Sequence, residues 1–239
     1  MTGNVLEADG ISVAFGGVQA LDDVDLHLAE GEQVGLIGSN GSGKSTLLNV
    51  VSGSVKPDRG QVRLLGRDVS RSAPHVRARR GLARTFQDLK LFERLSVRDH
   101  LRVGREGSRS RSAPPDKALL DGLGLSGFED SRTDVVGFGL RRSVEIARAL
   151  AAGPRVLLLD EPAAGLNTAE TERLAEALRT LVRDRGITLL LIEHNVGFVM
   201  NVCDRVVALD SGRVIASGTP AEVRAHPEVI AAYLGTGQA

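Results

Sequence analysis

The chain contains few aromatic residues and carries no excess of either charge. Only 3% of its 239 residues are aromatic, and tryptophan is absent. Platforms on which nucleic-acid bases stack are therefore not expected. Thirty basic side chains balance thirty acidic ones, so the bulk electrostatic attraction typical of nucleic-acid-binding proteins is missing as well. We expect no nucleic-acid partner.

Cysteine is almost absent, and so are long apolar runs. The single cysteine, Cys203, cannot form an internal disulfide, and we expect it to be a small buried apolar residue. The first residues are polar and carry acids, unlike a secretory signal peptide. The longest apolar runs, at 156–159 and 187–192, have the length of strands and are too short to cross a bilayer. These absences predict a soluble, intracellular protein.

A complete phosphate-binding motif is present near the N-terminus. Its residues are Gly38, Ser39, Asn40, Gly41, Ser42, Gly43, Lys44, Ser45 and Thr46. The glycines allow the backbone to form a nest whose N–H groups point at phosphate oxygens. Lys44 supplies an ammonium for the β- and γ-phosphates, and Ser45 supplies a hydroxyl ligand for Mg²⁺. An apolar strand at 33–37 precedes the motif and a helix at 44–51 follows it, so the phosphate would lie at a helix N-terminus. We expect the loop to bind a nucleoside triphosphate.

Two acids follow the apolar strand at 156–159. Asp160 and Glu161 stand at its carboxyl end, where ligands collect in open α/β sheets. We expect Asp160 to hold Mg²⁺ through water. We expect Glu161 to orient or deprotonate the water that attacks the γ-phosphate.

Two further side chains complete the candidate site. His194 ends the neighbouring apolar strand at 187–192, within reach of the same γ-phosphate, whereas the other four histidines have no such context. Gln87, in the run 83–87, carries an amide that would meet Mg²⁺ or the attacking water. The candidate catalytic residues are therefore Gln87, Glu161 and His194.

The apolar pattern predicts an α/β fold. Alternating residues predict strands at 6–15, 21–28 and 61–65, the first two joined as a hairpin through Gly16 and Gly17. From residue 156 onward, continuous apolar strands alternate with helices, the pattern of a parallel sheet covered on both faces. Among these helices are an amphipathic one at 168–185 and one that opens with a capping box at 219–222. The stretch 89–150 reads as helical but interrupted by a flexible loop at 107–115. Solvation of this loop is favoured over contact of its arginines with acidic lipid or RNA.

These motifs resemble the ATP-binding cassette (ABC) family in order and approximate spacing, over nearly the whole chain. The resemblance implies one ABC ATPase domain, 1–239, built on a P-loop NTPase core with a mostly parallel sheet. Residues 1–88 and 151–239 would form the RecA-like core with an N-terminal antiparallel β subdomain. Residues 89–150 would form an inserted helical subdomain, with its flexible loop at 105–116, that receives a membrane subunit. Phe15 stands where the family has an aromatic that stacks on adenine. Residues 164–167 stand where it has a loop that contacts the other cassette, so that two cassettes would pack head to tail around ATP.

Finer features resemble one branch, the ATPase subunits of branched-chain amino acid importers. They lie at 83–87, 163–167, 192–195 and in the C-terminal run 218–235. The resemblance implies a subunit that couples hydrolysis of ATP, with Mg²⁺, to the uptake of a small polar solute. Similar cassettes serve uptake systems for amides, urea or other small acids. Implied partners are membrane permease subunits, a second ABC ATPase in a homo- or heterodimer, and indirectly a periplasmic or extracellular solute-binding protein. The implied place is the cytoplasm, on the inner face of the cell membrane.

One segment departs from the family pattern. The signature loop Leu-Ser-Gly-Gly-Gln is replaced at 136–140 by Val-Gly-Phe-Gly-Leu. The serine hydroxyl that would reach the partner's γ-phosphate is missing at Gly137, and the glutamine is Leu140. The backbone of Gly137, Phe138 and Gly139 and the following helix N-terminus still offer donors and a dipole to a nucleotide. We expect the residues that bind and hydrolyse ATP on this chain's own phosphate-loop side to be complete. We expect the contacts that this chain offers to the nucleotide of a partner cassette to be weakened.

Two other functions fit parts of the sequence. A soluble cassette acting on DNA or ribosomes usually carries a long coiled-coil insertion or a second fused cassette, for which 239 residues leave no room. A nucleotide-sensing half of a heterodimeric ATPase is favoured by Gly137 and Leu140 and opposed by the intact Glu161 and His194. The apolar pair Leu91 and Phe92 has two readings as well, core packing or a groove for a permease helix.

Overall fold

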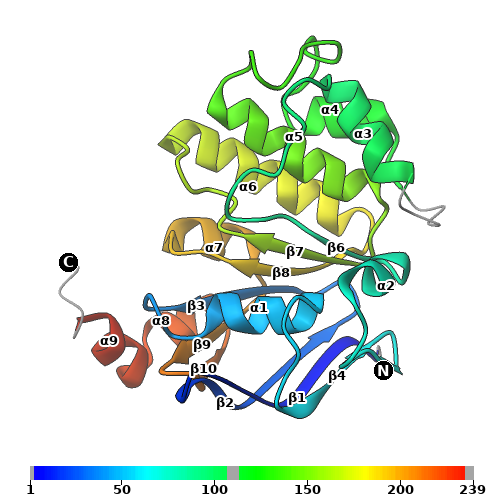
Figure 1. Ribbon diagram of the computed structural model, residues 1–239. Helices are drawn as coiled ribbons and strands as arrows, with labels where there is room; N and C mark the ends of the chain where they lie inside the picture. The colour runs from blue at the N-terminus through cyan, green and yellow to red at the C-terminus, as the bar shows by residue number, and fades with distance from the viewer. Residues whose placement is uncertain (1–2, 107–112, 235–239) are drawn as a thin grey trace.

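The computed structural model describes residues 3–106 and 113–234 (Figure 1). The expected flexible loop at 107–115 falls mostly outside these ranges. The strands are β1 (Asn4–Phe15), β2 (Val18–Ala29), β3 (Gln33–Gly38), β4 (Arg59–Leu64), β5 (Arg67–Asp68), β6 (Leu82–Arg84), β7 (Val156–Asp160), β8 (Thr188–Ile192), β9 (Arg205–Asp210) and β10 (Arg213–Gly218). The helices are α1 (Lys44–Ser52), α2 (Pro74–Arg79), α3 (Val97–Glu106), α4 (Asp116–Gly122), α5 (Phe138–Ala151), α6 (Thr168–Arg183), α7 (Val196–Val202), α8 (Pro220–Arg224) and α9 (Pro227–Leu234).

A four-stranded antiparallel sheet is built on the predicted hairpin, in the order β2-β1-β4-β5. The alternation in β2 decides which face is buried, since Val24, Leu26 and Leu28 lie in the core while Asp25 and His27 are exposed. Strand β4 begins two residues before the predicted 61, because Arg59 pairs with Ser12 of β1. Gly60 lies in this extension with a φ of 91°, and a Cβ there would lie 2.4 Å from the carbonyl oxygen of Gly10. The prediction that residues 59 and 60 belong to the turn was therefore wrong.

A six-stranded, mostly parallel sheet follows the order β10-β9-β3-β8-β7-β6. Strands β9, β3, β8, β7 and β6 pair in parallel, and only β10 is antiparallel to its neighbour. Strands β3, β7, β8 and β9 are buried on both faces, which is why they read as continuous apolar runs. Leu158 and Leu190 face one hydrophobic cluster, shared with α1 and the antiparallel sheet. Leu157 and Leu189 face the other cluster, shared with α5, α6 and α7.

The layers fix where a ligand can bind. Helix α1 lies between the two sheets, while α5 and α6 cover the opposite face of the six-stranded sheet, with α3 and α4 beyond them (Figure 1). Because β3, β7 and β8 are parallel, their carboxyl ends meet at one edge of the sheet. The expected α/β class, with antiparallel and mostly parallel sheets and helices, is confirmed.

Helix ends follow local chemistry. Asn167 and Glu170 form a capping box at the start of α6, and Thr219 and Glu222 form the predicted one at the start of α8. Helix α6 ends at Arg183, two residues before the predicted end. Cys203 is buried as expected, and burial raises the pKa of its thiol. Within residues 3–106 and 113–234, no helix has the length and apolarity needed to span a membrane.

Candidate nucleotide-binding site

The phosphate-binding motif forms the loop between β3 and α1. The Lys44 ammonium is buried and donates hydrogen bonds to the carbonyl oxygens of Gly38 and Ser39, each at 2.8 Å. Burial lowers the pKa of Lys44, while the charges of Glu161 and Asp160 act in the opposite direction. The ammonium is thus held by carbonyl dipoles in a partly dehydrated site, where an anionic phosphate would be a stronger partner.

The glycines of this loop are required by its backbone and its neighbours. Gly41 and Gly43 have φ values of 82° and 106°, in the region that favours glycine. A Cβ on Gly43 would lie 2.7 Å from the carbonyl oxygen of Ala20. The loop is also tied to the turn after β9, since the Gly212 N–H donates to the Ser42 carbonyl at 3.0 Å. The loop therefore keeps its shape through close backbone packing.

Asp160 ends β7 and its side chain is almost completely buried. Its Oδ2 accepts a hydrogen bond from Arg84 Nη2 at 3.1 Å. Burial raises the pKa of Asp160, and the charge of Arg84 opposes that rise. The Arg84 Nη1 also donates to Asn49 Oδ1 at 2.7 Å and to Ser52 Oγ at 2.8 Å, so this one guanidinium joins β6, β7 and α1.

The oxygen donors at this edge fit a magnesium ion. The Ser45 side chain is exposed at the start of α1, and Asp160 offers a carboxylate, the two ligand types that Mg²⁺ prefers in such sites. In the part of the chain that the structure describes, no group of three or more His, Cys, Asp and Glu side chains could hold a metal by itself. A magnesium ion here would therefore take other ligands from phosphate and water.

Glu161 and His194 lie in direct contact. The His194 Nε2 is 3.1 Å from Glu161 Oε1, which brings together two residues that the sequence placed on neighbouring strands. The register pairs Asp160 with Ile192, and the Glu161 N–H donates to the Ile192 carbonyl at 2.9 Å. Glu161 has a φ of 48°, a left-handed conformation that costs a non-glycine residue about 1–3 kcal/mol. Such strain is characteristic of functional positions.

Glu193 organises these two loops, and the sequence reasoning missed it. Its buried Oε1 accepts the Ala163 N–H at 2.7 Å. Its Oε2 accepts the N–H groups of His194 and Asn195 at 2.9 and 3.2 Å. One carboxylate therefore fixes the loop after β7 to the loop after β8. The available signal was an acid directly after a buried strand and directly before the candidate histidine.

Gln87 and Phe15 stand near this edge without touching the acids. Gln87 is exposed after β6, which pairs in parallel with β7, and its carbonyl accepts from Arg142 Nη2 at 3.3 Å. Among the described residues, no hydrogen bond joins the Gln87 side chain to Asp160 or Glu161. Phe15 ends β1 with half of its surface exposed, on the hairpin whose second strand packs against Gly43. Its ring is accessible to a flat ligand.

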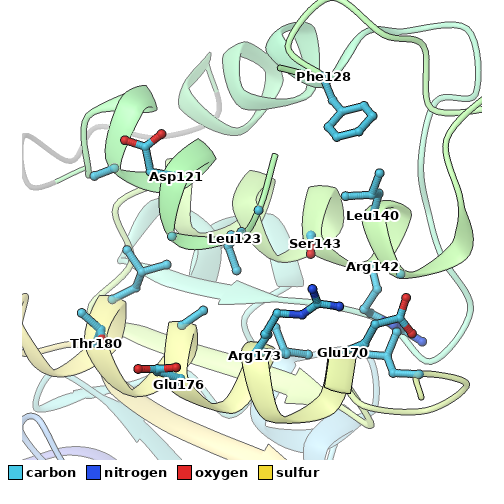
Figure 2. A pocket seen from close by; sticks show the side chains of 18 of the residues that line it. Asp121, Leu123, Phe128, Leu140, Arg142, Ser143, Glu170, Arg173, Glu176 and Thr180 are labelled. Atoms are coloured by element: carbon cyan, nitrogen blue, oxygen red, sulfur yellow. The ribbon is translucent and has the colours of Figure 1, made fainter. Parts of the chain in front are cut away.

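The segment 136–140 forms the start of α5. Gly137 is the N-cap residue and provides no side-chain cap. Gly139 packs against Glu170, where a Cβ would lie 2.7 Å from Oε1. Leu140 lines a cavity of about 790 Å³ between α4, α5 and α6. Figure 2 shows Phe128 and Leu140 on one side of this cavity and Arg173 of α6 on the other.

Known proteins match this chain over almost its full length. Residues 21–164 match the family described as ABC transporter, and residues 213–239 match the family described as branched-chain amino acid ATP-binding cassette transporter. The high-affinity branched-chain amino acid transport ATP-binding protein BraF of Pseudomonas aeruginosa is 35% identical, covering 98% of this chain and 99% of that protein. The LivG protein of Salmonella typhimurium, which carries the same description, is 37% identical with the same coverage.

Solved structures agree. An ATP-binding cassette of an ABC transporter in its ADP conformation superposes with a TM-score of 0.84 at 30% identity, covering 97% of this chain and 99% of the other. A nucleotide-free cassette superposes with a TM-score of 0.83 at 29% identity, covering 96% and 98%. The phosphate loop, the strand-end acids and these matches together assign the chain. It belongs to the ABC transporter family as an ATP-binding cassette, and members of this family hydrolyse ATP to power transport.

Proposed function

We propose that this chain is the ATPase subunit of an importer that takes up a branched-chain amino acid or a closely related small polar solute. Support for the solute comes from the match at 213–239 and from relatives described as branched-chain amino acid transport proteins. The observation that carries the ATPase role is the Glu161–His194 contact at 3.1 Å, on the same sheet edge as Lys44.

ATP would lie between the hairpin and the phosphate loop. Phe15 would stack on adenine, and the backbone of 38–46 with Lys44 would bind the phosphates. Ser45, Gln87 and Asp160 would hold Mg²⁺, which neutralises charge on the β- and γ-phosphates when bound. On binding ATP, the Lys44 ammonium would exchange its hydrogen bonds to the carbonyl oxygens of Gly38 and Ser39 for hydrogen bonds to phosphate oxygens.

Hydrolysis would use the two strand-end residues. Glu161 would accept a proton from the attacking water through a carboxylate oxygen. His194 holds that carboxylate through Nε2 and would sense the γ-phosphate, and Gln87 would respond to the same group from β6. Glu193 keeps the two loops at a fixed separation.

The partners follow from exposed features. Phe92 exposes 55% of its surface, which suits the predicted docking of a permease helix. Leu91 packs partly against the core, which suits the alternative prediction of core packing. We assign Phe92 to a groove on a helical subdomain at 89–150 that receives a permease subunit, with the core formed by 1–88 and 151–239. The exposed residues Gly137 and Phe138 would face a second cassette. A solute-binding protein would act indirectly, and the chain would sit on the cytoplasmic face of the membrane.

A second candidate function has one specific observation in its favour. The uncapped Gly137 and the apolar Leu140 suit a cassette that senses nucleotide while a partner carries more of the turnover. A role on DNA or ribosomes finds no support among the relatives described above.

Uptake by cells tests the proposal. Deletion of the gene for this chain should abolish uptake of labelled leucine, isoleucine or valine. The wild-type chain should restore it, and Lys44→Ala, expressed at an equal level, should not. Unchanged uptake of all three amino acids after the deletion, with loss of another solute such as urea or an amide, would refute the assignment of the solute.

A further inference from the structure

Side chains on one face of α5 form hydrogen bonds with the backbone on both sides of Gln87. Arg142, Glu145 and Arg148 are spaced by three residues along the helix, so their side chains share a face. Their partners are main-chain atoms of residues 86–90, a stretch without helix or strand structure. Since the contacts are to the backbone, they fix the path of this stretch independently of its side chains.

The contacts form a ladder of hydrogen bonds. Arg142 Nη1 donates to the Phe86 carbonyl at 3.2 Å, and Nη2 donates to the Gln87 carbonyl at 3.3 Å. Glu145 Oε1 accepts the Phe86 N–H at 3.3 Å. Further along, Arg148 Nη1 donates to the Lys90 carbonyl at 2.6 Å. The peptide units on both sides of Gln87 are therefore anchored to α5.

Arg142 and Glu145, the central pair of this face, are buried, and burying two charges costs free energy of desolvation. Arg142 and Glu145 form an ion pair at 3.0 Å with side chains that are 3% and 0% exposed. Burial raises the pKa of the Glu145 carboxyl, and the charge of Arg142 opposes the rise. Buried ion pairs often stabilise a fold no better than apolar residues of similar volume. Their directional bonds to residues 86–87 give this pair a geometric role instead.

The same guanidinium also reaches the start of α5. Arg142 Cζ lies 5.9 Å from the centre of the Phe138 ring. That ring covers Gly165, where a Cβ would lie 2.8 Å from Phe138 Cε1. Figure 2 shows Arg142 beside Glu170 at this end of α5. Arg142 therefore stands between the Gln87 stretch on one side and the residues 136–140 and 164–167 on the other.

We propose that Arg142 and Glu145 are positioning residues that join Gln87 to the segment 136–140, so that the two move as one body when nucleotide binds. The inference rests on the proposed roles of Gln87 at this chain's own γ-phosphate and of 136–140 at a partner's nucleotide. It adds the physical connection between them. A displacement of Gln87 is transmitted through the carbonyls of Phe86 and Gln87 to the Arg142 guanidinium and from there to Phe138. The buried ion pair with Glu145 restrains the Arg142 side chain along this route.

Distances between spin labels test this connection. Cys203→Ala removes the only cysteine, and labels are placed in pairs at the exposed positions Lys56, Asp88 and Val135. Arg142→Met with Glu145→Leu removes both charges together, so that neither is left buried without its partner. Arg98→Met with Asp130→Leu, which removes an exposed ion pair in the same part of the chain, is the matched control. The ligand is a non-hydrolysable ATP analogue with Mg²⁺.

In the parent protein, the analogue should change the Lys56–Asp88 and Lys56–Val135 distances together, while the Asp88–Val135 distance stays within about 1 Å. In the double variant, the Asp88–Val135 distribution should broaden roughly twofold, and the Lys56–Val135 distance should no longer follow Lys56–Asp88. Affinity for the analogue should stay at the parent value, with kcat reduced and KM unchanged. The control should behave as the parent.

Several outcomes decide the matter. An Asp88–Val135 distribution as narrow in the double variant as in the control would refute the connection. So would independent movement of the two labels in the parent. If the double variant does not fold, Arg142→Lys keeps the charge but loses the fork of donors, and should broaden the same distribution in part. Absence of analogue binding to the parent protein would instead refute the proposed nucleotide site, which separates the two failures.

Discussion

Restoring the missing polar groups at the start of α5 should raise turnover by the chain alone. The change is Gly137→Ser with Leu140→Gln. Gly137 has φ −62° and ψ 162°, which serine adopts readily, and a Cβ there meets open space within 4 Å. Serine is also a good N-cap residue, so the helix should not be weakened. Leu140 lines the cavity beside α6, which leaves room for an amide of similar length.

The size of the effect follows from the lost contact. A hydrogen bond to a charged group contributes about 1.5–3 kcal/mol. If the serine hydroxyl makes this bond to a partner's γ-phosphate in the transition state, its absence slows hydrolysis by roughly 10- to 100-fold. The backbone N–H groups at the N-terminus of α5 remain, so slow turnover persists without it.

The assay is steady-state release of phosphate by the purified chain over a range of protein concentrations, which also reports dimerisation. The restored variant should gain roughly 10- to 100-fold in kcat, and its turnover should saturate at a lower protein concentration. Gly137→Ala with Leu140→Gln is the matched control, because it differs from the restored variant only in lacking the serine hydroxyl. Equal kcat for the unmodified chain and the restored variant would show that the segment 136–140 is not defective.

Three further predictions test other parts of the structure. Lys44→Ala should weaken ATP binding by at least about tenfold in a fluorescent-nucleotide titration, because phosphate loses its charged partner. Wild-type affinity would contradict this. Phe92→Ser should leave ATP affinity and thermal stability unchanged and reduce co-purification with the permease, since the ring is exposed in the chain alone. Full co-purification would remove Phe92 from the docking surface. His100 is buried, and its Nε2 accepts the Phe92 N–H at 3.0 Å. Burial lowers the pKa of His100, so the unfolded chain binds more protons below about pH 6.5, and stability should fall as the pH drops below that value. Denaturant titrations of His100→Gln should show a weaker decline, and an identical decline would exclude His100 as the cause.

Much of the fold was predictable because its signals are local. The phosphate loop, the hairpin at Gly16 and Gly17, and the capping box at 219–222 each depend on a few adjacent residues. Strands buried on both faces can be recognised in the sequence as continuous apolar runs, as at 156–159. Boundaries were less accurate where a tertiary contact decides them. Strand β4 starts at Arg59 because that residue pairs with Ser12 of β1, which is far away in sequence.

The candidate site was predicted in part, for a similar reason. Asp160, Glu161 and His194 lie at or just after the carboxyl ends of apolar strands, so parallel pairing brings them to one edge. Arg84, Glu193 and the Arg142–Glu145 pair were missed. Charged residues usually lie on the surface, and nothing in their local sequence shows that they are buried. Their importance appears only through partners up to 76 residues away, as with Arg84 and Asp160.

A single-turnover measurement on Glu161→Gln tests the central claim that this chain hydrolyses ATP at the edge formed by β3, β7 and β8. The amide keeps the shape of the side chain and its contact distance to His194, but it cannot accept a proton from water. ATP affinity should remain at the wild-type value, while phosphate release should fall by roughly 100-fold or more. Phosphate release at the wild-type rate, in a preparation whose Lys44→Ala counterpart shows no contaminating activity, would contradict the account.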